Sequence, residues 1–317
     1  MDSLVLDLAA LLGGLVLLGK GADWLVDGSA ELARRRGVRP LIVGLTIVAW
    51  GTSAPEVVVS SLAAAEGRPA LALGNVLGSN VANIGLVLGV CALVLPTLLR
   101  RVLSLREGCW LVASVGAAWW LLADGAVSRA EGVGLLVVFA LYNLHLWSLV
   151  RGTSGTEQAA APESAPWPRV LVGSVAIALG AKLVVVGGIG IAERAGISDR
   201  VVGLTIIALG TSLPELAAGL SGALKNHGEL SLGNVVGSNV FNVLAVIGVA
   251  AVIAPLAPTE PEAVASIDRA LGVDFPVVMA LSLVLICLPR FAGAGSGRWK
   301  GALLVAAYLF YTWRVLA

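Results

Sequence analysis

Two pairs of polar motifs stand inside strongly apolar stretches of this sequence. A Gly-Thr-Ser-x-Pro-Glu motif ends at Glu56 and occurs again ending at Glu215. A Gly-Ser-Asn-x-x-Asn motif follows each copy and ends at Asn83 and at Asn242. Every matching position lies 159 residues later in the second copy, without a gap. The constant offset indicates an internal duplication, and ionisable groups in apolar sequence indicate a functional site.

The residue types in these motifs suit a hard cation. Together the two copies offer carboxylates, hydroxyls and amides, with no thiol or imidazole among them. Ca²⁺ binds about 6 to 8 oxygen ligands in a flexible cage, whereas a soft or tetrahedral metal favours Cys or His. Ser79 and Asn83 are four residues apart and share one helix face, as do Ser238 and Asn242. The amides one turn further back, which either support the site or join helices, are Asn75 and Asn234.

A proline precedes each of the two glutamates. Pro55 and Pro214 each remove an amide hydrogen and clash with the carbonyl one turn earlier, so the helices should break near 51–53 and near 210–212. Carbonyls that are freed inside a membrane need another partner, and a cation can be that partner. The hydroxyls at these two breaks belong to Thr52, Ser53, Thr211 and Ser212.

The composition places the chain in a lipid bilayer. Hydrophobic residues make up 58% of the chain, charged residues 13%, and the mean hydropathy is +0.93; soluble domains carry about 25% charged residues. The net charge of +1 and the lack of basic runs with interleaved aromatics argue against a nucleic-acid partner. The N-terminal segment is acidic and does not resemble a cleavable signal peptide.

Apolar segments of spanning length, about 20 residues each, occur along the whole chain. We therefore predict an all-α integral membrane protein with ten transmembrane helices. Five helices fall in a first repeat, 1–151, and five in a second repeat, 169–317, with a short linker at 152–168 and no soluble regulatory domain. Because each repeat holds an odd number of spans, the second repeat should be inverted. The predicted spans are 4–28, 40–65, 71–97, 108–124, 130–150, 168–192, 200–224, 229–256, 272–289 and 299–316.

The loop charges predict an orientation. Lys and Arg tend to stay on the cytoplasmic side of a membrane. If the N-terminus lies outside, the inner loops carry thirteen of these residues and the outer loops six. We therefore expect both termini on the extracytoplasmic side of the cell (inner) membrane and the linker in the cytoplasm.

The duplicated motifs resemble the α-repeats of the sodium/calcium exchanger branch of the Ca²⁺/cation antiporter superfamily, in its small prokaryotic form. The resemblance covers nearly the whole chain. It implies a transporter without a cofactor that exchanges Ca²⁺ for Na⁺ by alternating access, with ions bound mid-membrane between helices 2, 3, 7 and 8. By motif position, it assigns Glu56 and Glu215 to Ca²⁺, together with backbone oxygens of Thr52 and Thr211.

The resemblance also implies a wider set of ligands. The Na⁺ sites would use the same glutamates with additional residues, and two amides would line the centre. The additional Na⁺ residues are Ala49, Ser53, Ser79, Ala208, Ser212 and Ser238, and the central amides are Asn83 and Asn242. Some members carry Asp where this chain has Asn242, so this site holds two formal negative charges, which weakens the case for K⁺ co-transport.

The coupling follows from charge. Two ionised glutamates close together in a low dielectric repel each other, so burial of the empty site is costly. Ca²⁺ or at least two Na⁺ ions cancel these charges, so occupied states can pass through an occluded form while the empty state resists it. We expect the glycine-rich helices 1 and 6 to form the moving layer.

Other interpretations remain open at this stage. The coupling ion could be H⁺ in a related branch, although the Thr-Ser before Pro-Glu favours Na⁺. The glutamates could instead pair with Lys20 or Lys182 as structural ion pairs. An intramembrane enzyme with paired carboxylates is a distant alternative because no nucleophile with an adjacent base is present, and a scaffold without transport would not explain the duplicated polar motifs. Asp23 and Asp27 should be paired or reach towards the membrane surface.

Overall fold

The computed structural model describes residues 2–100, 103–151, 166–195, 208–288 and 297–316. In these ranges the regular structure is helical, apart from an isolated antiparallel bridge between Val127 and Leu256. Within the described ranges, six helices are long and apolar enough to cross a membrane, and a seventh candidate is a pair of helices bent by 48°, Pro40–Thr52 and Ala54–Ala65. The prediction of an all-α integral membrane protein is confirmed, whereas the division into two repeats stays a prediction.

Apart from the first helix, the helices of the first half lie close to the predicted spans. Short π- or 3₁₀-helical segments, labelled η, continue one α-helix into the next, end a helix or, in the case of η3, form a separate turn. The elements are α1 (Asp2–Arg36), α2 (Pro40–Val43), η1 (Gly44–Val48), α3 (Ala49–Thr52), α4 (Ala54–Ala65), α5 (Pro69–Ala82), η2 (Asn83–Val87), α6 (Leu88–Val94), η3 (Leu98–Arg100), α7 (Leu105–Leu121), η4 (Leu122–Asp124) and α8 (Arg129–Arg151).

The second half has the same kind of interrupted helices. Residues 200–207 of the seventh predicted span lie outside the described residues. The described elements are α9 (Trp167–Arg194), α11 (Ala208–Gly210), α12 (Leu213–Leu224), α13 (Gly228–Phe241), η6 (Asn242–Val246), α14 (Ile247–Ile253), α15 (Pro261–Arg269), η7 (Ala270–Asp274), α16 (Phe275–Cys287) and α17 (Gly297–Leu316).

Two helices begin or end well away from their predicted boundaries. α1 continues to Arg36 instead of ending near residue 28. Its last turns are polar, and their charged side chains pair with one another; Arg34, for example, bonds to Glu31 at 2.6 Å. The ninth run begins at Pro261 instead of 272, since the mostly exposed, polar α15 continues through η7 into the apolar α16. Hydropathy alone marks only the apolar part of such helices.

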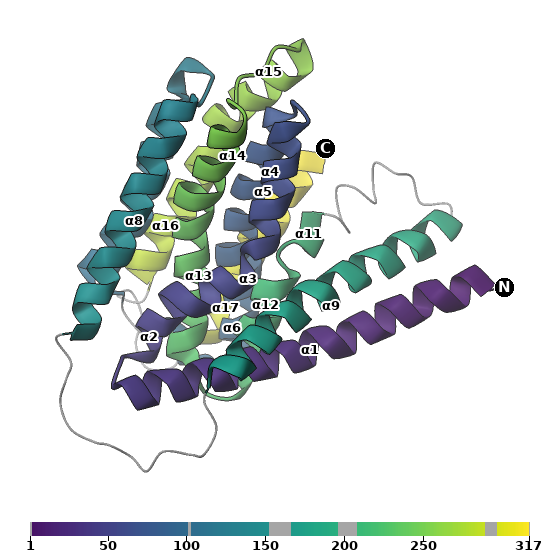
Figure 1. Cartoon of the computed structure of the whole chain (residues 1–317), viewed down its shortest axis with the longest axis vertical. Coiled ribbons are helices and arrows are strands. Elements are labelled where there is room, and N and C mark those ends of the chain that lie inside the picture. The colour runs from purple at the N-terminus through teal and green to yellow at the C-terminus, as the bar shows by residue number, and fades with distance from the viewer. Residues whose placement is uncertain (1, 101–102, 152–165, 196–207, 289–296, 317) are drawn as a thin grey trace.

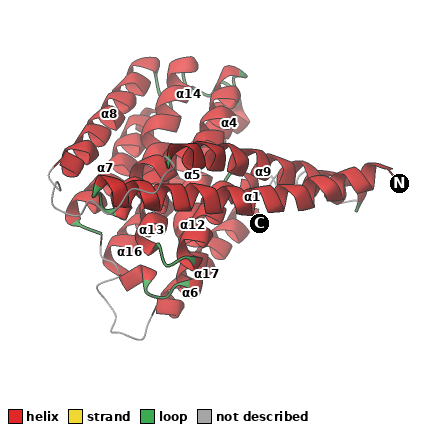
Figure 2. Cartoon of the chain, turned by 60° about the horizontal axis from the view of Figure 1, so that its bottom comes forward, coloured by secondary structure: helices red, strands yellow, loops and turns green. Residues whose placement is uncertain are grey.

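α1 and α9 form a long pair that lies against one side of the remaining bundle (Figure 1). Gly14 of α1 lies against the backbone of Gly180 and Val184, whereas Gly28 lies against Val170, so the two chains run antiparallel. A Cβ atom added to Gly14 would come within 2.7 Å of the Val184 backbone nitrogen. Figure 2 shows the same pair reaching beyond the other helices. The glycines thus permit backbone-to-backbone packing along the pair.

The burial of the helices separates the centre of the molecule from its periphery. In each of the runs Pro69–Val94 and Gly228–Ile253, 78% of the apolar spanning window is buried, compared with 17% in α1. Gly233 and Gly237 of α13 lie against the backbone of Leu41 and Leu45, which brings α13 close to α2 and η1. The runs α5–η2–α6 and α13–η6–α14 are therefore the central helices, and both carry a Gly-Ser-Asn-x-x-Asn motif.

Candidate functional site

Both glutamate-bearing helices break where the prolines predict. Ser53 separates α3 from α4 with φ −89° and ψ 8°, and Ser212 precedes α12 with φ −87° and ψ 0°. The proline that follows each serine lies in the first turn of its helix, at Pro55 and Pro214. The carbonyls of the two residues four positions earlier, Gly51 and Gly210, therefore have no amide hydrogen at the usual helical position.

The glutamates that follow these breaks are completely enclosed. Glu56 and Glu215 both have 0% exposure. Most of the other expected ligands are buried with them, whereas Thr211 is half-buried and the side chain of Ala208 lies outside the described part of the chain. The other expected ligands that are buried are Ala49, Thr52, Ser53, Ser79, Asn83, Ser212, Ser238 and Asn242. The duplicated motifs thus converge on one enclosed polar region of the bundle.

Glu215 accepts hydrogen bonds from hydroxyl groups of both halves of the chain. The Ser53 hydroxyl donates to Oε1 of Glu215 at 2.7 Å and lies 2.9 Å from Oγ of Ser238. Ser238 Oγ lies 3.4 Å from the same carboxylate oxygen. Because Ser53 lies at the helix break of the first half and Ser238 belongs to α13, this cluster joins the two motif copies at one carboxylate.

The equivalent cluster around Glu56 is less complete. Among the described residues, both carboxylate oxygens of Glu56 and the hydroxyl of Ser212 have no hydrogen-bond partner. Ser79 and Thr211 approach each other at 3.5 Å between hydroxyl oxygens, which matches the 3.5 Å between Thr52 and Ser238 in the other copy. The carboxyl groups of Glu56 and Glu215 also interact electrostatically across the site. Buried carboxylate oxygens without donors are strong candidates for cation ligands.

The two asparagines one turn further back have different roles. Asn234 accepts a hydrogen bond from the Thr52 hydroxyl at 3.1 Å and so supports the site. Asn75 instead donates to the Ser60 hydroxyl at 2.9 Å and joins α5 to α4. Of the two interpretations left open for these positions, support of the site therefore applies to Asn234 and a link between helices applies to Asn75.

Asn80 and Asn239 belong to a buried amide cluster and were not among the predicted ligands. Asn80 accepts a hydrogen bond from Asn242, and Asn239 accepts one from Asn83. All four side chains have 0% exposure. The signal was present in the sequence, because both residues recur at the same offset within the Gly-Ser-Asn motif, but their partners lie in the opposite copy.

The two lysines considered as structural partners, Lys20 and Lys182, do not neutralise the glutamates in the described structure. Neither Lys20 nor Lys182 forms an ion pair with Glu56 or Glu215 within the described ranges. The structural ion-pair interpretation is therefore wrong for these residues.

The aspartates of α1 do have a cationic partner. Lys225 lies 3.1 Å from Asp23 and 2.8 Å from Asp27. The Ser221 hydroxyl also donates to Asp23 at 2.7 Å. The expectation that these aspartates are paired is confirmed, and the contacts connect α1 to the end of α12.

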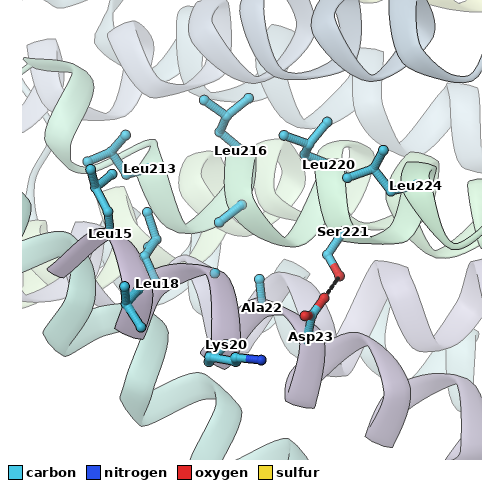
Figure 3. Close-up of a pocket in the computed structure, with 13 residues that line it drawn as sticks. Leu15, Leu18, Lys20, Ala22, Asp23, Leu213, Leu216, Leu220, Ser221 and Leu224 are labelled. Carbon is cyan, nitrogen blue, oxygen red and sulfur yellow. Dashed lines mark hydrogen bonds between the residues drawn. The ribbon is translucent and has the colours of Figure 1, made fainter. Parts of the chain in front are cut away.

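A cavity of about 580 Å³ lies between α1 and α12, next to these contacts (Figure 3). Its lining residues all come from these two helices, and leucines such as Leu18 and Leu216 predominate. Figure 3 also shows the hydrogen bond from Ser221 to Asp23 at its edge. Glu56 and Glu215 do not line this cavity, so α1 and α12 are incompletely packed at a place separate from the carboxylate cluster.

The fold and the site together define a class. Helices long and apolar enough to span a bilayer surround carboxylates, hydroxyls and amides supplied by broken helices of both halves. Broken helices whose polar groups converge at depth are the ion-binding device of membrane transporters. The chain is a multi-pass membrane protein of this class.

Comparison with known proteins gives the family. The family model for sodium/calcium exchanger protein matches residues 6–148 and 166–317, and the chain belongs to this family. The chain is 40% identical over 314 residues to CaxA of Alkalimonas amylolytica, a match that covers 95% of this chain and 96% of that protein. It is 30% identical over 345 residues to sodium/calcium exchanger MaX1 of Methanosarcina acetivorans, with 95% and 96% covered.

The solved structures agree with the family match. The sodium-calcium exchanger NCX_Mj soaked with 10 mM Na⁺ and 10 mM Sr²⁺ superposes with a TM-score of 0.81 at 32% identity, and the match covers 97% of each chain. The resemblance to the small prokaryotic exchangers is confirmed. Because the related proteins are exchangers and antiporters, the chain is a transporter, and the enzyme interpretation is wrong.

Proposed function

We propose that this protein exchanges Ca²⁺ for Na⁺ across a cell membrane through the cluster around Glu56 and Glu215. The observation that carries the proposal is the complete burial of both glutamates, one from each motif copy, with three of their four carboxylate oxygens unpaired in the described structure. Two buried negative charges without cationic partners are costly, and a bound divalent cation would offset them. The names of the relatives MaX1 and NCX_Mj support Na⁺ and Ca²⁺ as the exchanged ions.

The proposed Ca²⁺ ligands are the two carboxylates and two backbone oxygens, from Thr52 and Thr211, next to the helix breaks. The Na⁺ ions share the carboxylates and use hydroxyl and carbonyl oxygens around them. The short contacts from Ser53 to Glu215 and Ser238 support this sharing, because one hydroxyl already touches two proposed ligands. The remaining proposed ligands are Ala49, Ser79, Ala208, Ser212, Asn83 and Asn242.

Charge balance makes the transport an exchange in this proposal. The carboxylates carry two formal negative charges, which either one Ca²⁺ or at least two Na⁺ ions neutralise. Moving the ion-free doubly charged site through an enclosed intermediate requires uncompensated burial of like charges. Return of the protein to the other side therefore requires the second ion, which couples the two gradients.

The pair α1 and α9 is the proposed moving layer for alternating access. Its helices pack closely on each other along much of their length, as the glycine contacts at Gly14 and Gly28 show. By contrast, the 580 Å³ cavity separates part of α1 from α12. In this proposal the closely packed pair shifts as one unit against the core helices, and the gap beside α12 gives α1 room for the shift.

The proposed orientation puts both termini on the extracytoplasmic side and residues 152–168 in the cytoplasm of the cell (inner) membrane. The excess of Lys and Arg in the predicted inner loops supports it. An impermeant thiol reagent tests it on a variant with a single added cysteine in that linker. Labelling in inverted vesicles but not in intact cells is expected, and the reverse result would contradict the orientation.

Flux in proteoliposomes tests the proposed exchange. Vesicles loaded with Na⁺ and diluted into Na⁺-free buffer should accumulate radioactive Ca²⁺, and vesicles with equal Na⁺ on both sides should not. A pH gradient without Na⁺ provides the control. Uptake that follows the pH gradient alone would replace the proposal by H⁺/Ca²⁺ antiport, and no gradient-driven uptake under either condition would contradict the antiporter proposal.

A further inference from the structure

Four buried asparagines form two equivalent hydrogen bonds between the halves of the chain. Asn83 Nδ2 donates to Asn239 Oδ1 at 3.3 Å, and Asn242 Nδ2 donates to Asn80 Oδ1 at 3.1 Å. Asn239 occupies the position in the second copy that Asn80 occupies in the first, and Asn242 that of Asn83. The two bonds are therefore related by the duplication, and each one crosses from one copy to the other.

These bonds fix the orientation of the side-chain amides of Asn83 and Asn242. A carboxamide is planar and carries a donor on one side and an acceptor on the other. Because the Nδ2 atoms of Asn83 and Asn242 point at Asn239 and Asn80, their Oδ1 atoms must point away from these partners. Both Oδ1 atoms are buried and unpaired in the part of the chain that the structure describes.

The backbone places these oxygens at the site. Asn83 and Asn242 lie one helical turn after Ser79 and Ser238, on the same helix face. Ser238 contacts Ser53, which donates to Glu215, so this face borders the carboxylate cluster. In addition, a π-helical segment begins at each of these asparagines, η2 at Asn83 and η6 at Asn242, and such segments frequently mark functional positions.

We propose that Asn80 and Asn239 are positioning residues that hold the amide oxygens of Asn242 and Asn83 towards the transported cation. Without the acceptor on its partner, each amide can rotate by half a turn and present its NH₂ group, whose positive end repels a cation. The inference rests on the proposed exchange function and adds to it two residues that act through other ligands.

Asn80 has a second bond that fixes its own orientation. Its Nδ2 donates to the backbone carbonyl of Asn239 at 3.2 Å. The Asn80 oxygen is thereby directed to Asn242, and the two central helices are tied together at the same point. The corresponding Nδ2 of Asn239 has no partner within the described ranges. Substitution of Asn239 therefore breaks fewer side-chain hydrogen bonds than substitution of Asn80.

A double-mutant cycle tests the positioning role through the half-saturating Ca²⁺ concentration of Na⁺-driven uptake. Asn239→Ala and Asn83→Ala should each raise it by about tenfold, the equivalent of one lost favourable contact with the ion. The double variant should be no worse than Asn83→Ala alone, because Asn239 acts through Asn83. The equivalent cycle in the other pair uses Asn80→Ala and Asn242→Ala. Asn239→Ser keeps an acceptor oxygen, so it should retain most of the Ca²⁺ affinity that Asn239→Ala loses.

The matched control combines residues that do not bond to each other. Asn239→Ala and Asn242→Ala belong to different pairs, and their side chains share no hydrogen-bond partner because Asn239→Ala keeps the backbone carbonyl that Asn80 uses, so their effects should add. Additive effects within the bonded pairs, or unchanged Ca²⁺ dependence in Asn239→Ala, would overturn the positioning role. So would failure of both Asn239→Ala and Asn80→Ala to fold, judged by thermal unfolding, since the role would then be structural. Absence of Na⁺-driven uptake in the unsubstituted protein would instead contradict the exchange function itself.

Discussion

The two copies of the motif have nearly the same residues but different hydrogen bonding. Glu215 accepts the hydroxyl of Ser53 at 2.7 Å, whereas both oxygens of Glu56 and the hydroxyl of Ser212 are unpaired among the described residues. Ser53 directs its one hydroxyl hydrogen to Glu215, whereas the equivalent hydroxyl of Ser212 makes no such bond to Glu56 within the described residues. Duplication therefore supplies equivalent ligands without enforcing equivalent contacts, and a shared cation would be the group that engages both carboxylates.

The largest expected effect comes from removing either charge. Glu56→Gln and Glu215→Gln should each weaken Ca²⁺ binding by at least about 100-fold, since a bound divalent ion loses one of two buried counter-charges, a change of about 3 kcal/mol or more. Radioactive Ca²⁺ uptake in proteoliposomes measures it. Glu66→Gln, at an exposed glutamate, is the control and should transport normally. A strong effect in only one of the two buried variants would mean that the copies differ in function as well as in hydrogen bonding.

The second effect tests the contrast between the moving pair and the core. In a cysteine-free background, a disulfide between Asp23→Cys and Ser221→Cys should reduce uptake at least about tenfold, because it ties α1 to α12 where the native side chains lie 2.7 Å apart. Reduction should restore transport.

The control disulfide joins the two helices that should move together. Asp7→Cys and Gly190→Cys lie on α1 and α9, where Gly190 packs directly against the Asp7 side chain. This disulfide should leave transport intact. Full activity of the oxidised Asp23–Ser221 pair would contradict the moving layer.

A smaller effect, on protein stability, should distinguish Ser53 from Ser212. Ser53→Ala removes the hydrogen bond to Glu215 and should destabilise the protein by about 1–3 kcal/mol in buffer without Na⁺ or Ca²⁺. Ser212→Ala should cost less, because its hydroxyl has no partner among the described residues. Thermal unfolding in detergent compares them. Equal losses in the two variants would show that the clusters are equivalent in solution.

The smallest effect is expected at the surface contacts of α1. Lys225→Met removes the ion pairs to Asp23 and Asp27, which are partly exposed on both sides. Such pairs contribute about 0–1 kcal/mol, so the uptake rate should change by no more than about fivefold. A complete loss of transport would mean that this contact is part of the exchange cycle.

The sequence alone predicts the fold class and the main site because both leave local signals. Proline after Thr-Ser predicts a helix break, and the breaks occur at Ser53 and Ser212. The repeated acid in apolar sequence predicts burial, and Glu56 and Glu215 are fully enclosed. The ligand assignments beyond burial stay predictions.

Other features depend on contacts between distant segments. Asn80 and Asn239 could not be assigned from the sequence, since each partner lies more than 150 positions away in the other copy. The different roles of Asn75 and Asn234 are equally invisible, because the difference comes from neighbours such as Ser60, whose equivalent in the second copy is Gly219. The extension of α1 to Arg36 reflects charged side chains that are paired within the folded protein.

The most direct measurement is the position of a bound divalent ion. Crystals soaked with Sr²⁺, located by its anomalous scattering, should show one peak within ligand distance, about 2.3–2.6 Å for a Ca²⁺-like ion, of carboxylate oxygens from both Glu56 and Glu215. The same peak should disappear as Na⁺ is raised. A peak that touches only one glutamate, or that lies elsewhere while the site stays empty, would contradict a cation shared between the two motif copies.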